Sequence, residues 1–250
     1  DQWSRMFNKL NWNKMEEEKR KIPYYKVNMS EMIHKIRNLI KKCSHLKTNS
    51  SHKDNDIRKD IYTYLMQELQ SLMCGIELSP SLQDNSFYLY WEGKTLDKKQ
   101  MEDCKSLFLD SLFNGFYFLF FVQVENYLRL IANSNDINKE EFSIMKTFEN
   151  LVNECKLSKE DENLFSIFSE LRNLSHNGGF YSKENNKSIE FKGYKFIFEK
   201  GNSTKLPFSM IESNIFIAEH IIDLIEKINQ KTEKIDYIED NYAKIEFTYE

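Results

Sequence analysis

Glycine and proline are scarce in this chain. Its 250 residues include 7 glycines and 3 prolines, roughly 4% of the sequence where average usage would give about 12%. Tight turns depend on these two residues, so the scarcity argues against β-sandwiches, barrels and doubly wound sheets. It predicts long helices and a mainly α fold, a helical bundle.

Bulk composition excludes further classes. With 40% hydrophobic and 30% charged residues, the chain can bury a core, which argues against global disorder. Its net charge of −4 lacks the overall basic character of a nucleic-acid coat protein. Any site for a polyanion must therefore be local.

The four cysteines, Cys43, Cys74, Cys104 and Cys155, include no CxxC pair. This spacing argues against a zinc site and favours reduced, buried thiols in a cytoplasmic protein. No motif indicates a metal or another cofactor. The longest apolar run, Phe116–Val122, is seven residues, against the about 20 of a membrane span, so no membrane association is expected.

Apolar residues recur at helical spacing along most of the chain. The pattern predicts helices over residues 30–46, 56–74, 99–132, 139–155 and 159–175, and a last helix that starts near Ser209. The second is expected to end at Gly75, and the fifth to begin with a capping box of Ser158 and Asp161. Helix 99–132 is apolar nearly all round in its middle, which predicts a place at the centre of the bundle.

Two segments differ from this helical pattern. Residues 188–191 and 194–198 predict a β-hairpin before the last helix. Residues 78–97 are expected to form a loop with one short strand. We therefore divide the chain into three parts: residues 1–105 form an N-terminal helical region with a loop or strand segment, residues 106–231 a helical core with the hairpin at 188–200, and residues 232–250 an acidic tail. Within these parts, residues 1–26 are expected to dock as an arm and 245–249 to add a strand.

One string combines residues suited to phosphate chemistry: Leu171-Arg172-Asn173-Leu174-Ser175-His176-Asn177-Gly178-Gly179. Arg172 and His176 are four residues apart, so they lie on one side of a helix. Imidazole can move protons near neutral pH, and guanidinium matches the geometry of phosphate. In RNA, the 2′-OH can attack the adjacent phosphorus when a base removes its proton and a cation stabilises the charged oxygens. This route needs no metal.

The string, placed at the end of a helix and followed by a short hairpin, resembles the HEPN superfamily, whose RNases carry an Arg, often followed by Asn, and then a His. The usual spacing leaves four to six residues between Arg and His, whereas this chain leaves three. The resemblance implies that Arg172 stabilises phosphate, His176 transfers protons, Asn173 orients, and Glu125, on an earlier helix, holds Arg172. It also implies a homodimer with a composite active site, and a toxin or antiviral-defence effector with an antitoxin or defence-system partner.

Other interpretations of these residues stay open. Arg172 and His176 would also suit the C-terminal end of a helix dipole, and Glu125 could pair with Arg129 one turn later. A non-catalytic HEPN-like module that binds RNA, a nucleotide or a protein partner, as a sensor or scaffold, is the alternative function.

A basic run between Lys35 and Lys59 could guide RNA to the site or could be a solvated face. We select Lys41 and Lys42, with Asn177 beside the motif, as candidate RNA-binding residues. His220 is expected to be a boundary residue rather than a ligand.

Overall fold

The computed structural model describes residues 28–134, 143–177, 181, 183, 185–200 and 205–240. Over these residues the protein is a mainly α bundle with a two-stranded antiparallel hairpin before the last helix, which confirms the predicted fold class. The α-helices are α2 (Met29–Asn49), α3 (Ile57–Leu78), α4 (Asn85–Glu92), α5 (Lys98–Ser134), α6 (Ile144–Cys155), α7 (Lys159–His176) and α8 (Met210–Lys231). A 3₁₀ helix, η3 (Ser79–Gln83), precedes α4, and the strands are β1 (Lys187–Phe191) and β2 (Tyr194–Phe198).

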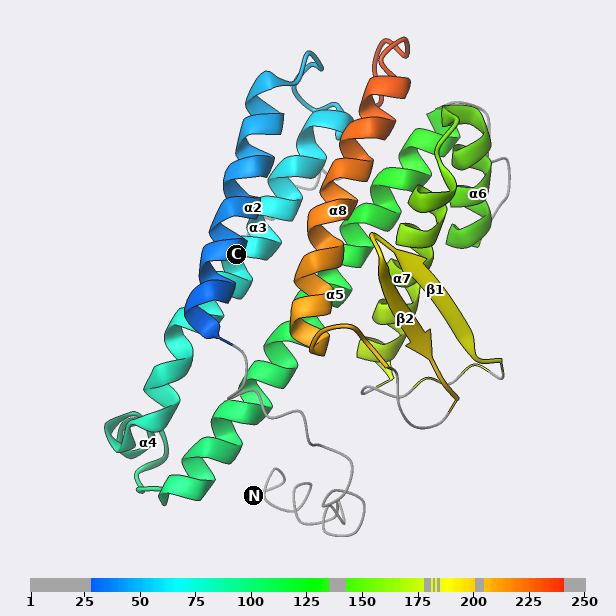
Figure 1. Cartoon of the computed structure of the whole chain (residues 1–250). Helices are drawn as coiled ribbons and strands as arrows, with labels where there is room; N and C mark the ends of the chain where they lie inside the picture. Colours follow the sequence, from blue (N-terminus) through cyan, green and yellow to red (C-terminus); the bar gives the residue numbers. More distant parts are fainter. Residues whose placement is uncertain are drawn as a thin grey trace.

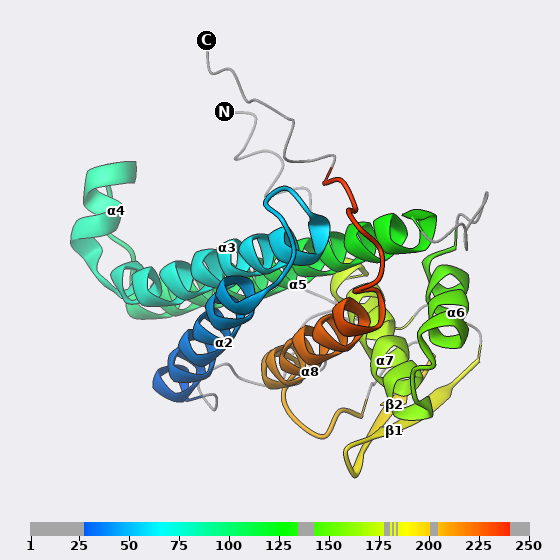
Figure 2. The ribbon, with the colours of Figure 1, turned by 90° about the horizontal axis from the view of Figure 1, so that it is seen from above.

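The long helices lie side by side (Figure 1). Helix α2 packs on α3 and α8, whereas α5 packs on α3, α6 and α7, and α7 also contacts α8. The hairpin lies against α7 on the side away from α5, as Figure 2 shows. The boundary expected between residues 105 and 106 falls inside helix α5, which runs through both residues without a break.

Aromatic rings fill the contact between α5 and α7. Phe168 of α7 lies 4.8 Å from the ring of Phe121 and 5.4 Å from that of Tyr117, both on α5. The Tyr117 hydroxyl donates to the carbonyl of Phe168 at 3.3 Å. These rings are fully or almost fully buried, so the contact fixes the position of α7, and with it Arg172, relative to α5.

The central place predicted for α5 is only half right. Its other side is exposed and apolar, with exposed fractions between 36% and 47% at five side chains: Leu107, Phe108, Phe118, Leu119 and Val122. We call these five residues the α5 face. Helix α5 is also long and apolar enough to cross a membrane by length and composition alone, a test that the core helix of a soluble protein passes too. The hydrophobicity predicted around the whole helix therefore corresponds to a core side and an exposed apolar side.

Two further expectations are wrong between α3 and α5. Helix α3 does not end at Gly75 but continues to Leu78. A Cβ at Gly75 would lie 2.6 Å from the methyl carbons of Leu112 on α5, so this glycine permits close helix packing rather than marking a terminus. The expected loop and strand at 78–97 is instead η3 and α4, and Asp84 caps α4 by accepting from the backbone N–H of Ser86.

The other local signals give the predicted structures. Ser158 and Asp161 form a capping box at the start of α7, and Ser209 with Glu212 forms another at the start of α8. Lys192 and Gly193, with φ of 50° and 76°, form the hairpin turn, and two positive φ angles in succession are the type I′ geometry that matches strand twist.

Asp56 and Arg58 form a buried ion pair at the start of α3. The guanidinium donates to both carboxylate oxygens at 2.9 and 2.6 Å and to the carbonyl of Thr232 at 2.6 Å. The backbone N–H of Ile238 donates to Asp56 at 3.3 Å. We call these four residues the clamp, because they tie the segment after α8 to α3.

The expected arm at 1–26 and the strand at 245–249 lie outside the described residues.

The cysteines are all free, but not all buried. Cys43 and Cys155 are in the core, whereas Cys74 is exposed and Cys104 is half-buried. Burial raises the pKa of the Cys43 thiol to about 12, so this thiol is an inert core group.

Candidate functional site

The last two turns of α7 carry the motif residues. Their backbone is helical through His176, and Asn177 caps the helix with its N–H donating to the carbonyl of Asn173 at 3.0 Å. Asn177 has a φ of −94°, so its backbone is outside the left-handed region. The side chain of His176 and residues Gly178 and Gly179 lie outside the described part of the structure.

Glu125 of α5 lies between two arginines. Arg129 donates to one of its carboxylate oxygens from Nε at 3.1 Å and from Nη2 at 2.7 Å. Nη2 of Arg172 is 3.8 Å from the other oxygen. Both pairings considered from the sequence therefore occur together. Among the described residues, the Glu125 carboxylate is therefore shared by two guanidinium groups.

Arg172 is held in place but not saturated. Its guanidinium lies 4.7 Å from the centre of the Phe121 ring, and Nη1 donates to Oδ1 of Asn173 at 3.2 Å. Its Nε and the hydroxyl of Ser175 are buried, and neither has a hydrogen-bond partner among the described residues. Buried donors are normally satisfied, so unpartnered groups at this point are consistent with a site that a ligand completes. The side chain is 31% exposed.

Asn173 links Arg172 to a second carboxylate. Its Nδ2 is 3.4 Å from Oε2 of Glu170, whose side chain is only 2% exposed. Oε1 of Glu170 accepts from Nζ of Lys183 at 2.7 Å and from Nζ of Lys187 at 3.2 Å. Lys187 also donates to the hydroxyl of Ser166 at 2.6 Å.

Glu170, Lys183 and Lys187 were not predicted as site residues. The sequence does contain a signal for Glu170, because it stands among the apolar residues Phe168 and Leu171, where a charge needs a partner. It contains no comparable signal for the lysines. Their meeting depends on how the chain turns back after α7.

The same three residues line a pocket of about 270 Å³ with Tyr181, Asn185 and Asn186. We call it the lysine pocket. Tyr181 is 3% exposed and its ring lies 5.7 Å from that of Phe198. Burial, and then the charge of Glu170, raises the pKa of the Tyr181 hydroxyl, so this group is a neutral donor at physiological pH.

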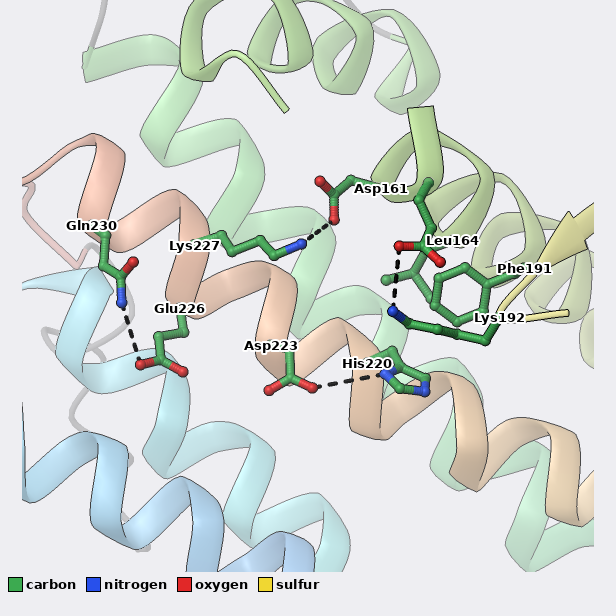
Figure 3. A pocket seen from close by; sticks show the side chains of 10 residues that line it. Asp161, Leu164, Phe191, Lys192, His220, Asp223, Glu226, Lys227 and Gln230 are labelled. Carbon is green, nitrogen blue, oxygen red and sulfur yellow. Dashed lines mark hydrogen bonds and ion pairs between the residues drawn. The ribbon is translucent and has the colours of Figure 1, made fainter. Parts of the chain in front are cut away.

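A second pocket of about 410 Å³ lies between the start of α7, the hairpin turn and α8 (Figure 3). We call it the hairpin pocket. Its charged side chains are largely paired with one another: Lys192 with Glu160 at 3.3 Å, Lys227 with Asp161 at 2.7 Å, and His220 with Asp223 at 3.7 Å. The remaining lining residues are Leu164, Phe191, Glu226 and Gln230. His220, which the sequence analysis treated as a boundary residue, therefore lines a pocket.

The structure does not bring Lys41 and Lys42 to Arg172. They lie on α2, and α8 stands between α2 and α7 (Figure 2). Lys41 is exposed, while Lys42 pairs with Asp223 of α8 at 2.5 Å. Arg58, in the same basic run, is buried in the clamp. Acidic partners thus neutralise part of the basic run.

No group of three or more His, Cys, Asp or Glu side chains that could hold a metal ion occurs within the described residues. Comparison with protein-family models, with curated proteins and with solved structures finds no match for this chain.

Proposed function

We propose that the protein is a HEPN-type endoribonuclease that cleaves RNA through attack of the 2′-OH on the adjacent phosphorus, without a metal. One observation carries the proposal: Glu125 of α5 and Arg172 of α7, which the resemblance selects from distant parts of the sequence, lie 3.8 Å apart. A role as a toxin or antiviral-defence effector, acting with an antitoxin or defence-system partner, is part of the same proposal.

In this mechanism each residue has a role that follows from the chemistry of its side chain. Arg172 stabilises the negative charge that develops on the phosphate oxygens through the exposed part of its side chain, which is 31% exposed. His176, one turn later, takes the proton of the 2′-OH and supplies one to the leaving 5′ oxygen. Glu125 positions Arg172, and Asn173 holds Nη1. The products are a 2′,3′-cyclic phosphate and a 5′-OH.

The proposal includes a homodimer with a composite active site, and the α5 face supports it. Val122, Glu125 and Arg129 follow Phe118 at i+4, i+7 and i+11, so the apolar face continues directly into the charged pair on one side of the helix. A second copy that covers this face would lie beside Glu125 and Arg172. Exposed apolar surface of this kind commonly marks an interface.

Cleavage in EDTA tests the assignment. The wild-type protein is expected to cut mixed single-stranded RNA and to leave 2′,3′-cyclic phosphate ends. His176→Ala is expected to lower the rate by about 10²–10⁴-fold, and Arg172→Ala by about 10²–10³-fold. Arg37→Ala removes an exposed arginine that pairs with Glu77 on the far side of the bundle, and it should leave the rate unchanged.

Two outcomes count against the enzyme. Cleavage that persists in both motif variants contradicts the site. Intact RNA with every substrate, together with RNA or nucleotide binding that Arg172→Ala weakens, supports the alternative of a non-catalytic module that uses the same residues.

Leu119→Lys tests the dimer. A lysine in the middle of the α5 face is expected to convert a dimer into a monomer in sedimentation velocity, and to lower cleavage at equal protein concentration. Leu78→Lys is the matched control, because Leu78 is 65% exposed but lies outside this face. A wild-type protein that sediments as a monomer while it cleaves RNA would contradict the composite site.

A further inference from the structure

The two pockets beside α7 have opposite charge. The lining of the hairpin pocket contains four carboxylates against two lysines. Among the described residues, the lysine pocket holds two ammonium groups, Lys183 and Lys187, against one carboxylate, Glu170. In a chain with a net charge of −4, this local positive excess favours an anion at the lysine pocket.

The donors of the lysine pocket are only partly used. Each ammonium has three N–H donors, and Lys183 uses one and Lys187 two within the described residues. The hydroxyl of Tyr181 has no hydrogen-bond partner among those residues, and Tyr181 lines the pocket. Asn186 accepts through Oδ1 from the N–H of Lys200 at 2.9 Å, which leaves its amide N–H₂ available.

We propose that the lysine pocket binds a phosphate group of an RNA strand, next to the phosphate that Arg172 contacts. This inference rests on the proposed function for its choice of RNA. Lys183 and Lys187 supply charge, and Tyr181 supplies a neutral hydroxyl donor. Glu170 keeps both ammonium groups at one place. Asn173 contacts both Glu170 and Arg172, so it connects the two phosphate positions.

The size of the pocket fits this ligand. At about 270 Å³ it is near the lower end of small-molecule pockets, which span roughly 300–1,000 Å³. It has room for a phosphate with its ribose. A site for one backbone phosphate makes RNA binding stronger and more salt-dependent without reading its sequence.

Binding of a short 2′-O-methyl RNA in EDTA, followed by fluorescence anisotropy at several salt concentrations, tests the inference. This RNA cannot be cleaved through its 2′ position, so the measurement does not depend on activity. K183Q/K187Q is expected to weaken binding about tenfold and to reduce the slope of log K against log salt by about 1. K192Q/K195Q makes the same charge change on the same hairpin, away from the pocket, and should retain most of the affinity. Equal losses in the two double variants would overturn the site.

Tyr181→Phe gives a second test that preserves the fold, because the ring beside Phe198 stays and only the hydroxyl is lost. It is expected to weaken RNA binding several-fold. Wild-type affinity in Tyr181→Phe and K183Q/K187Q would overturn the inference.

Two further results distinguish the phosphate site from its assignment to RNA and from the proposed enzyme activity. If K183Q/K187Q loses binding of 5′-AMP but keeps RNA affinity, the phosphate site stands and its assignment to RNA is wrong. If the protein never cleaves RNA but binds it through the two lysines, the proposed enzyme fails and the lysine pocket stands.

Discussion

The molecule contains two clusters of arginine and carboxylate that use the same chemistry for different ends. In the clamp, Arg58 and Asp56 are at most 1% exposed, and each guanidinium nitrogen has a partner. Around Glu125, Arg172 is 31% exposed and its Nε has no partner among the described residues. The ion pair of the clamp is buried and fully paired. In the cluster of Glu125, Arg129 and Arg172, which we call the motif cluster, Arg172 is partly exposed and only partly paired.

This difference shows how a structural ion pair can be told from a candidate site. A buried pair is retained only when each donor and acceptor is used, because every unmatched group there costs free energy. A cluster that leaves donors unmatched gives up that stability. Arg172 keeps its side chain 31% exposed, and we propose that this exposed part contacts phosphate oxygens.

Truncation of the clamp is expected to have the largest effect on stability. Arg58→Ala leaves Asp56 buried without its counter-charge, and it should lower the free energy of unfolding by about 3–5 kcal/mol. Urea unfolding followed by circular dichroism measures this loss. A loss below about 1 kcal/mol would mean that the clamp contributes no more than a surface pair.

Acid should weaken the clamp in a way that can be assigned to one group. Burial tends to raise the pKa of Asp56, but hydrogen bonds and charge from Arg58 outweigh it and hold this pKa below its usual value. A carboxyl with a lowered pKa in the folded state stabilises the fold above the unfolded pKa of about 3.9, and this contribution is lost as the pH falls through the folded pKa. The stability difference between wild type and Asp56→Asn should therefore shrink from pH 7 to pH 3 in urea titrations. A constant difference would contradict this assignment.

The matched truncation in the motif cluster should have the smallest effect on stability. Arg172→Ala loses the contact with the Phe121 ring, worth about 0.5–1 kcal/mol, and removes a buried donor that has no partner among the described residues. Glu125 keeps Arg129. The free energy of unfolding should fall by about 1 kcal/mol or less, so the loss of cleavage expected for this variant would not come from unfolding. A loss as large as that of Arg58→Ala would make the two clusters alike.

The sequence was sufficient for most of the fold because the signals are local. Helical spacing and the capping residues Ser158 and Ser209 place α7 and α8 almost to the residue. Gly75 misled because its role is to make room for Leu112 of another helix, a contact that no local pattern contains. The exposed apolar side of α5 was missed for the same reason, since hydrophobicity alone does not show how many neighbours a helix has.

The residues of the candidate site also differ in whether local sequence patterns could predict them. Arg172 and Asn173 follow from one string, and the resemblance linked them with Glu125. Lys183 and Lys187 could not be predicted, because their distance from Glu170 depends on the path of the chain between α7 and the hairpin.

The two ends of the clamp are synthesised at different times. Arg58 donates to the carbonyl of Thr232, 174 residues later. At the usual pace of about 5–20 residues per second, Thr232 leaves the ribosome roughly 10–35 s after Arg58. Throughout that time the arginine at the start of α3 lacks one of its native acceptors. The hydrogen bonds of the clamp can therefore form completely only after helix α8 has been synthesised.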